Sequence, residues 1–147
     1  MSINLPSASE SVAPVSNADL VRSAVTAMNA GQVATYLSYF TPTCLRWVAG
    51  FDEPLTVTDV EVNLQQLVDA FTPLLLREEL LMSDGAFVCA RWRLQGTQTG
   101  EFMGLEPVGG HIDVSTCEIY EIADEKVVTV WTYQDPGQLF RQMGPAA

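Results

Sequence analysis

The stretch DVSTCEIYEIADEKVVTVWTY, residues 113–133, decides the fold of this chain of 147 residues. It holds two runs, 113–122 and 127–133, on either side of an Ala-Asp-Glu turn, and the side chains of each run follow a period of two residues. A period of two is typical of β-strands, and a short polar turn between two such runs predicts an antiparallel hairpin.

Two further strands are expected before this hairpin. Residues 74–82 and 86–95 follow the same period around a Ser-Asp-Gly turn, and a loop rich in glycine and proline, residues 96–110, leads on to the hairpin. Glu78 and Glu79 interrupt the period, which indicates a bulge or a solvated edge. Together the four runs predict a meander of consecutive strands.

Helical patterns come before the strands. Asn17 can cap a helix whose apolar side chains recur with helical spacing until Gly31. A shorter helical segment is expected at residues 33–40, before a proline that disfavours helical geometry in the residue preceding it. An extended stretch is expected next, at about residues 44–49.

A capping box is expected to start the next helix. The Thr58 hydroxyl and the Glu61 carboxylate can each bind a free backbone N–H there, and the helix is expected to end at Pro73. A short terminal helix is expected after Asp135. This order predicts an α+β domain, in which a curved, mostly antiparallel sheet and about three N-terminal helices enclose a pocket.

Composition narrows the classes of function. Eighteen Asp and Glu against 7 Lys and Arg leave a net charge of −11, which repels phosphate backbones and anionic membranes and excludes nucleic-acid binding. No apolar run approaches the roughly 18 residues that span a bilayer, and no leader pattern is found, so a cytoplasmic protein is expected. Three cysteines and one histidine predict reduced, buried thiols and no zinc site.

The chain is rich in apolar residues. Hydrophobic residues make up 48% and charged residues 17%, against about 25% charged in a typical globular protein. Because the predicted strands are apolar on both faces, the outer face of the sheet is expected to pair with another subunit in a homodimer. We place a single domain at residues 17–147, and interpret residues 1–16 as a disordered arm rich in Ser, Pro and Ala.

Several motifs resemble the SnoaL-like polyketide cyclase family. The loop GTQTGEFMGLEPVG, which begins at Gly96, is similar to the family's G-T-H-x-G-x-F-x-G-x-x-P-T-G. EIYEIADEKVV at 118–128 is similar to its I-Y-R-I-x-D-G-K-I-V hairpin, and residues 131–144 are similar to its ending, W-x-x-x-D-x-x-x-L-x-x-Q-x-G. With the A-x-N-x-G helix end at 27–31, the resemblance covers most of residues 17–144.

The resemblance implies the cone-shaped α+β barrel of the nuclear-transport-factor-two and ketosteroid-isomerase superfamily. It also implies a dimer without metal or organic cofactor, and a deep pocket for a polyketide-derived or polycyclic substrate. In the family's type enzymes an aspartate on the last strand, and a histidine two residues before it, transfer protons in an aldol cyclisation. Those positions align with Thr132 and Val130, and Gln98 replaces the family's loop histidine, so the acid/base pair is absent.

Glu118 is the leading candidate for a catalytic group. By the period of two it shares a strand face with Val114, Thr116, Tyr120 and Ile122, among mostly apolar neighbours. If this face lines the pocket, removal from water makes Glu118 a usable proton shuttle near neutral pH. The alternative is an ion pair across the sheet with one of three arginines: Arg46, Arg91 or Arg93.

Arg46 and Thr132 complete the predicted catalytic set. Arg46 could hold a substrate carboxylate or stabilise an enolate, with a structural ion pair as the alternative, and Thr132 could donate to a carbonyl oxygen. The expected substrate-binding residues supply aromatic, soft or small polar surface. They are Tyr36, Trp47, Phe71, Trp92, Phe102, Met103, Thr116 and Tyr120.

These observations favour a cofactor-independent cyclase or isomerase of secondary metabolism. It would act on a polyketide-derived or polycyclic hydrophobic small molecule, by acid/base-assisted or conformation-driven intramolecular ring closure. The alternatives are a non-catalytic binding protein for a hydrophobic small molecule and a dimeric interaction module. The volume and polarity of the pocket, and the direction in which Glu118 points, distinguish them.

Overall fold

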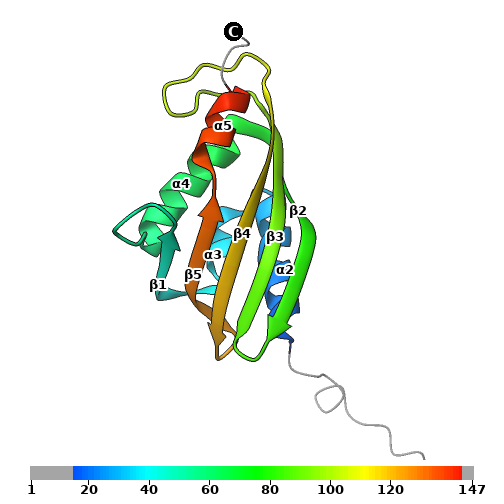
Figure 1. Ribbon diagram of the computed structural model, residues 1–147, viewed down its shortest axis with the longest axis vertical. Coiled ribbons are helices and arrows are strands. Elements are labelled where there is room, and N and C mark those ends of the chain that lie inside the picture. Colours follow the sequence, from blue (N-terminus) through cyan, green and yellow to red (C-terminus); the bar gives the residue numbers. More distant parts are fainter. Residues whose placement is uncertain (1–14, 144–147) are drawn as a thin grey trace, which may run out of the picture.

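A computed structural model of the chain describes residues 15–143 (Figure 1), so the predicted N-terminal arm lies outside the described residues except for its last two positions. The elements in chain order are α2 (Asn17–Asn29), α3 (Val33–Leu37), β1 (Phe40–Val48), α4 (Val57–Ala70), β2 (Phe71–Asp84), β3 (Phe87–Gln98), β4 (His111–Ala123), β5 (Lys126–Gln134) and α5 (Pro136–Met143). None of these helices is long and apolar enough to cross a membrane.

The five strands form one sheet in the order β1-β5-β4-β3-β2. Strands β2 to β5 pair antiparallel with their neighbours along the chain, which confirms the predicted meander and the α+β class. The bulge predicted at Glu78 and Glu79 is also present, as a register shift between Glu78 and Leu80. Strand β1 adds to the far edge, parallel to β5.

Several predicted boundaries in the first half of the chain are wrong. The helix expected to end at Pro73 ends at Ala70, and the next strand, β2, begins at Phe71 rather than at residue 74. The second helix ends at Leu37 rather than at residue 40, and the strand after it begins at Phe40 rather than at residue 44. Strand β1 therefore contains Pro42. A proline is tolerated there because β1 is an edge strand, where a missing backbone N–H removes no hydrogen bond on the open side.

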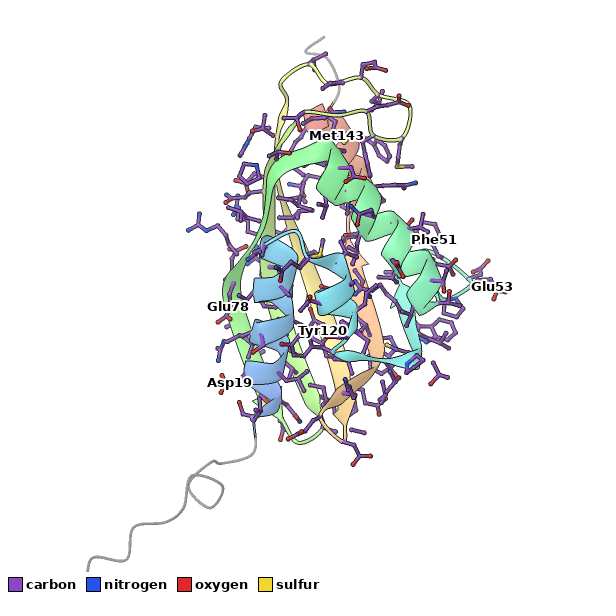
Figure 2. The ribbon with its side chains drawn as sticks, turned by 180° about the vertical axis from the view of Figure 1, so that it is seen from behind. Asp19, Phe51, Glu53, Glu78, Tyr120 and Met143 are labelled. Carbon is purple, nitrogen blue, oxygen red and sulfur yellow. The ribbon has the colours of Figure 1, made fainter. Side chains whose placement is uncertain are left out.

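The helices α2, α3 and α4 cover one face of the sheet (Figure 2). Helix α2 buries an apolar stripe that includes Leu20, Val21 and Val25 against this face. Its cap is Ser16, not the predicted Asn17: the Ser16 hydroxyl accepts a hydrogen bond from the Asp19 backbone N–H at 3.1 Å. Helix α5 lies at the end of the molecule where the β3–β4 loop emerges (Figure 1).

The capping box of α4 lies two residues before its predicted position. Thr56 Oγ1 accepts from the Asp59 backbone N–H at 3.2 Å, and the Thr56 backbone N–H donates to the Asp59 carboxylate at 2.9 Å. These bonds from the Thr56 backbone and side chain lower the pKa of Asp59. Thr58 and Glu61 match the same sequence pattern, but both lie on the exposed side of the helix.

This difference leads to a prediction. Thr56→Ala is expected to lower the free energy of unfolding by about 1 kcal/mol, because the first turn of α4 loses its side-chain acceptor. Thr58→Ala removes an exposed hydroxyl and is expected to change it by less than about 0.5 kcal/mol. Urea denaturation of the two variants checks the assignment, and a larger loss for Thr58→Ala would contradict it.

The two glycines of the GTQTG segment, one near the end of β3 and one just after it, lie against the junction of α4 and β2. A Cβ on Gly96 would be 2.8 Å from the Pro73 carbonyl oxygen, and one on Gly100 would be 2.9 Å from the Asp69 carbonyl oxygen. Both approaches are too close for a side chain. The motif therefore keeps the start of the β3–β4 loop in contact with the α4–β2 junction.

The predicted burial of the three cysteines holds for one of them. Cys44 is buried, but Cys89 and Cys117 are half-buried on β3 and β4, with their sulfur atoms 3.9 Å apart. All three are free thiols. Cys89 directly precedes the buried Ala90, and Cys117 directly precedes the buried Glu118. Because adjacent residues of a strand point to opposite faces, both cysteines lie on the outer face of the sheet.

Candidate functional site

A cavity lies between the helices and the inner face of the sheet. Its inner part has a volume of about 160 Å³, and its outer part, which reaches Leu139 and Phe140 of α5, has about 400 Å³. The two parts share lining residues from strands, loop and α4, and therefore adjoin: Val48, Leu55, Asn63, Leu67, Leu94 and Gln134. Sites for small molecules are commonly about 300–1,000 Å³ in volume and mostly apolar, as here.

Glu118 points from β4 into the inner part of the cavity. The strand buries every second residue, as the period of two predicts, and Glu118 itself is 5% exposed. Its carboxylate accepts hydrogen bonds from the Thr132 hydroxyl on β5 at 2.9 Å and from the Tyr120 hydroxyl at 3.0 Å. The cross-strand register places Thr132 directly opposite Glu118, which explains the first of these contacts.

Arg46 approaches the same carboxylate from β1. Its guanidinium Nη1 lies 2.5 Å from Glu118 Oε2, and Nη2 donates to the Tyr36 hydroxyl oxygen at 2.9 Å. Leu55, in the segment before α4, holds the backbone of Arg46 through a pair of hydrogen bonds at 2.8 and 2.9 Å. Of the three possible arginine partners of Glu118, the structure selects Arg46.

The ion pair and the functional position are therefore not alternatives. Glu118 is paired with Arg46, and both side chains line the inner part of the cavity together with Tyr36, Thr116 and Thr132. Arg46 has more N–H donors than these contacts use. The Tyr36 hydroxyl accepts a hydrogen bond from Arg46, and the hydroxyl proton of Tyr36 is donated to no other described residue. Donors remain for a ligand beside a carboxylate.

A second layer of polar contacts supports Glu118 from behind. The Trp92 indole N–H donates to the Tyr120 hydroxyl at 3.0 Å, and Tyr120 in turn donates to Glu118. Both rings are almost fully buried, at 1% and 2% exposure. Figure 2 shows Tyr120 under the helices at the centre of the sheet. The chain Trp92–Tyr120–Glu118 fixes one oxygen of the carboxylate.

Burial changes the titration of the groups around Glu118. It raises the pKa of Tyr36, against the opposing charge of Arg46, and raises the pKa of Tyr120 further still, with the negative charge of Glu118 adding to it. For Arg46, burial lowers the pKa, but the negative charge of Glu118 and the hydrogen bond to Tyr36 more than offset this effect, so the net pKa is raised. Arg46 therefore stays charged and both tyrosines stay protonated.

The raised tyrosine pKa values predict a loss of stability at high pH. In the unfolded chain a tyrosine releases its proton at about pH 10, whereas Tyr36 and Tyr120 still hold theirs in the folded state. Their contribution is complete below about pH 10 and is expected to fall above it, by up to about 1.4 kcal/mol per pH unit for each proton retained. Urea midpoints between pH 8 and 11.5 measure this slope.

A matched pair of variants tests that assignment. Tyr120→Phe is expected to make the alkaline slope shallower, because one retained proton is removed. Tyr133→Phe removes a tyrosine that is half-exposed on β5, and is expected to keep the wild-type slope. Equal slopes in Tyr120→Phe and the wild type would contradict the prediction.

Seven of the eight predicted substrate-binding residues fall into three groups in the structure. Tyr36 and Thr116 line the inner part of the cavity, and Phe102 and Met103 line the outer part. Phe71, Trp92 and Tyr120 lie in the core: Phe71 packs edge-on against Phe102, and the other two support Glu118.

Trp47 lies outside the site. Adjacent residues of a strand point to opposite faces, so Trp47 points away from the cavity that Arg46 enters. It is 40% exposed on the outer face, beside Trp131. Arg91 and Arg93 lie on this face too, where their ion-pair partners are Glu79 and Asp113.

Sequence reasoning missed two amide side chains that line both parts of the cavity, Asn63 of α4 and Gln134 of β5. Gln134 follows Thr132 by two residues on the same strand, so the period of two could have found it. Asn63 carries no comparable signal, because only the packing of α4 on the sheet brings it to the cavity.

Comparisons with known proteins agree with this architecture. Residues 18–143 match the family model described as SnoaL-like polyketide cyclase. No curated protein matches the chain. Among solved structures, AclR from Streptomyces galilaeus shares 23% identity over 87% of this chain and 95% of its own, with a TM-score of 0.79.

Two further solved structures have the same fold. IdmH from Streptomyces antibioticus shares 21% identity over 86% of this chain and 97% of its own, with a TM-score of 0.74. An NTF2-like protein of unknown function from Burkholderia pseudomallei shares 11% identity over 86% of this chain and 95% of its own, with a TM-score of 0.68. At such identities the likeness is one of fold.

Proposed function

Since the chain belongs to the SnoaL-like polyketide cyclase family, we propose that it is a cofactor-independent cyclase or isomerase. Its substrate is a hydrophobic, polyketide-derived or polycyclic ketone that fits the cavity. The observation that carries this proposal is the placement of a carboxylate, Glu118, beside two donors, Tyr36 and Arg46, at the inner end of an otherwise mostly apolar cavity.

The chemistry of these groups suits enolisation. A ketone oxygen accepts hydrogen bonds from the Tyr36 hydroxyl and from Arg46, and the Glu118 carboxylate takes a proton from the carbon next to the carbonyl. The electron pair of the broken C–H bond moves onto the oxygen as an enolate. Arg46 and Tyr36 stabilise that negative charge where water is largely excluded.

The same intermediate leads to either product. In ring closure the enolate carbon forms a bond to a second carbonyl carbon of the substrate, and the new alkoxide recovers the proton from Glu118. In isomerisation Glu118 returns the proton to a different carbon. The cavity walls hold the substrate in the conformation that brings the reacting carbons together.

A second candidate is a binding protein that performs no chemistry. Two observations favour it: Thr132 and Val130 stand where the family's type enzymes have aspartate and histidine, and the Glu118 carboxylate already accepts from Arg46, Thr132 and Tyr120. These three donors occupy lone pairs of the carboxylate that a substrate proton would need.

Proton exchange on a simple ketone separates the two candidates. The probe is 2-acetylnaphthalene in D₂O, whose methyl protons exchange through the enolate. We expect the protein to accelerate this exchange, as followed by proton NMR. Saturable quenching of tryptophan fluorescence by the same ketone, without faster exchange, would establish binding alone and sink the proposed enzyme.

We further propose that a second copy of the chain covers the outer face of the sheet. Apolar side chains are exposed there, including Leu80, Met82 and Phe87. Register and strand period also place three of the seven basic residues on this face, namely Arg77, Arg91 and Arg93. The carboxylates of Glu79 and Asp113 lie beside these arginines and that of Glu121 lies on the same face, so this face is much less negative than the net charge of −11 of the whole chain, which lowers the repulsion between two copies.

Native mass spectrometry tests the dimer. We expect a species of twice the chain mass at micromolar concentration. A chain that stays single at tens of micromolar would contradict the proposed pairing.

A further inference from the structure

Thr116 places a buried hydroxyl in the wall of the cavity. It lies on β4, two residues before Glu118 on the same strand face, and is only 7% exposed. Among the residues that the structure describes, none forms a hydrogen bond with Thr116 Oγ1. Leaving a buried polar group unpaired is costly, so such a group in a cavity wall points to a ligand that pairs with it.

The sheet register places Thr116 opposite Gln134 on β5. The next inward pair on this face is Glu118 opposite Thr132, two residues away and therefore roughly 7 Å further along the strand. Gln134 lines both parts of the cavity, whereas Thr116 lines the inner part. The wall thus carries two polar pairs, one at the inner end and one where the two parts of the cavity meet.

The two pairs differ in how they are satisfied. Glu118 and Thr132 bind each other and Arg46. Within the described residues, Thr116 Oγ1 forms no hydrogen bond, whereas Gln134 is an exposed side chain that water can reach. A hydroxyl and an amide can each donate or accept, so this second pair suits a carbonyl, hydroxyl or ether oxygen of a ligand.

Charge limits the ligand further. Arg46 is the cationic side chain that lines the described cavity, and Glu118 neutralises it. The outer part adds the carboxylates of Glu53 and of Asp135, the second of which pairs with Arg141 at 3.2 Å, and the whole chain carries a net charge of −11. An anionic ligand would meet net negative charge in this cavity, so Arg46 is unsuited to hold a substrate carboxylate.

We propose that Thr116 and Gln134 form a second hydrogen-bonding site, which selects an uncharged polycyclic ligand with two oxygens. One oxygen binds at Tyr36 and Arg46, and the other, on a different ring or on the opposite side of a ring, binds at Thr116 and Gln134. This inference rests on the proposed use of the cavity as the substrate site. It makes Thr116 a residue that determines specificity.

Two matched ketones test the proposal. The first is 2-acetylnaphthalene, and the second is its 6-hydroxy analogue, which adds one oxygen on the other ring. Affinities are measured by quenching of tryptophan fluorescence, with calorimetry as a check. We expect the wild-type protein to bind the hydroxylated ketone about tenfold more tightly, which corresponds to about one neutral hydrogen bond.

Three variants assign that preference. Thr116→Val keeps the shape of the side chain and is expected to lose the tenfold preference without weakening 2-acetylnaphthalene, whereas Thr116→Ser, which keeps the hydroxyl, is expected to retain it. The control Thr129→Val removes a threonine hydroxyl that donates to Glu121 on the outer face, and is expected to bind both ketones as the wild type does.

Equal affinity of the wild-type protein for the two ketones would overturn the proposal, and so would a Thr116→Val variant that keeps the preference. Proton exchange recorded on the same samples separates this inference from the proposed function. A tenfold preference without faster exchange supports the second hydrogen-bonding site and rejects the enzyme. Faster exchange without any preference does the reverse.

Discussion

Replacing Glu118 with glutamine is expected to slow protein-catalysed proton exchange on 2-acetylnaphthalene by about 10²–10⁴-fold, the usual contribution of a general base. Glutamine has nearly the same size and its amide oxygen can still accept from Arg46 and Thr132, so the wall of the cavity keeps its shape. The variant lacks a carboxylate oxygen that can take a proton from carbon. Proton NMR in D₂O, at saturating ketone, measures the rate.

Glu121→Gln is the matched control. Glu121 lies on the same strand, three residues after Glu118, but its carboxylate accepts from Thr129 on the outer face of the sheet. The control is expected to exchange protons at the wild-type rate. Full activity in Glu118→Gln would reject the carboxylate as the base, and would leave a reaction driven by conformation and by the donors Tyr36 and Arg46.

Replacing Glu118 with alanine is expected to lower the free energy of unfolding by about 3–5 kcal/mol, because removal of one partner of a buried ion pair leaves the other charge uncompensated. The Arg46 side chain is 13% exposed and the Glu118 side chain 6%, so water replaces little of the lost contact. Tyr120 and Thr132 would also lose the acceptor of their hydroxyl protons. Urea denaturation at neutral pH measures the loss.

Two further variants isolate the ion pair as the cause. The double variant Arg46→Met/Glu118→Met replaces both charges with flexible apolar side chains and is expected to recover most of the stability, since buried pairs are often no better than well-packed apolar residues. Glu78→Ala breaks the exposed pair with Arg22, and is expected to cost much less because water screens that pair. A double variant as unstable as Glu118→Ala would contradict this account.

The sequence predicted the sheet well because strand patterns are local. The period of two in residues 113–133 determined that Val114, Thr116, Glu118, Tyr120 and Ile122 share one face, and all five are buried. The same rule separates Arg46 from Trp47, which cannot both enter the cavity from one strand, so the prediction for Trp47 contradicted its own strand period. The glycines of the loop motif can also be recognised from their spacing in the sequence. The reason that glycine is required there, however, is a close approach between backbone segments far apart in the chain.

Helix starts were predicted less well because two candidates matched one pattern. Thr56 with Asp59 and Thr58 with Glu61 have the same spacing and similar chemistry, two residues apart. The choice between them depends on where the chain leaves Leu55, whose backbone is bonded to Arg46 of β1. A contact between separate elements thus decides the first residue of a helix.

By itself, the sequence determined the α+β class, the inward face of β4 and the family, because each depends on spacing along the chain. Only the tertiary structure decided that Arg46, 72 residues from Glu118, is the partner of that carboxylate, and that the Tyr36 hydroxyl joins them. It also decided that Thr116 Oγ1 has no hydrogen-bond partner within residues 15–143. The physical reason is that side chains pair only where the sheet register and the packed helices bring them within hydrogen-bonding distance. Their separation along the chain does not determine that distance.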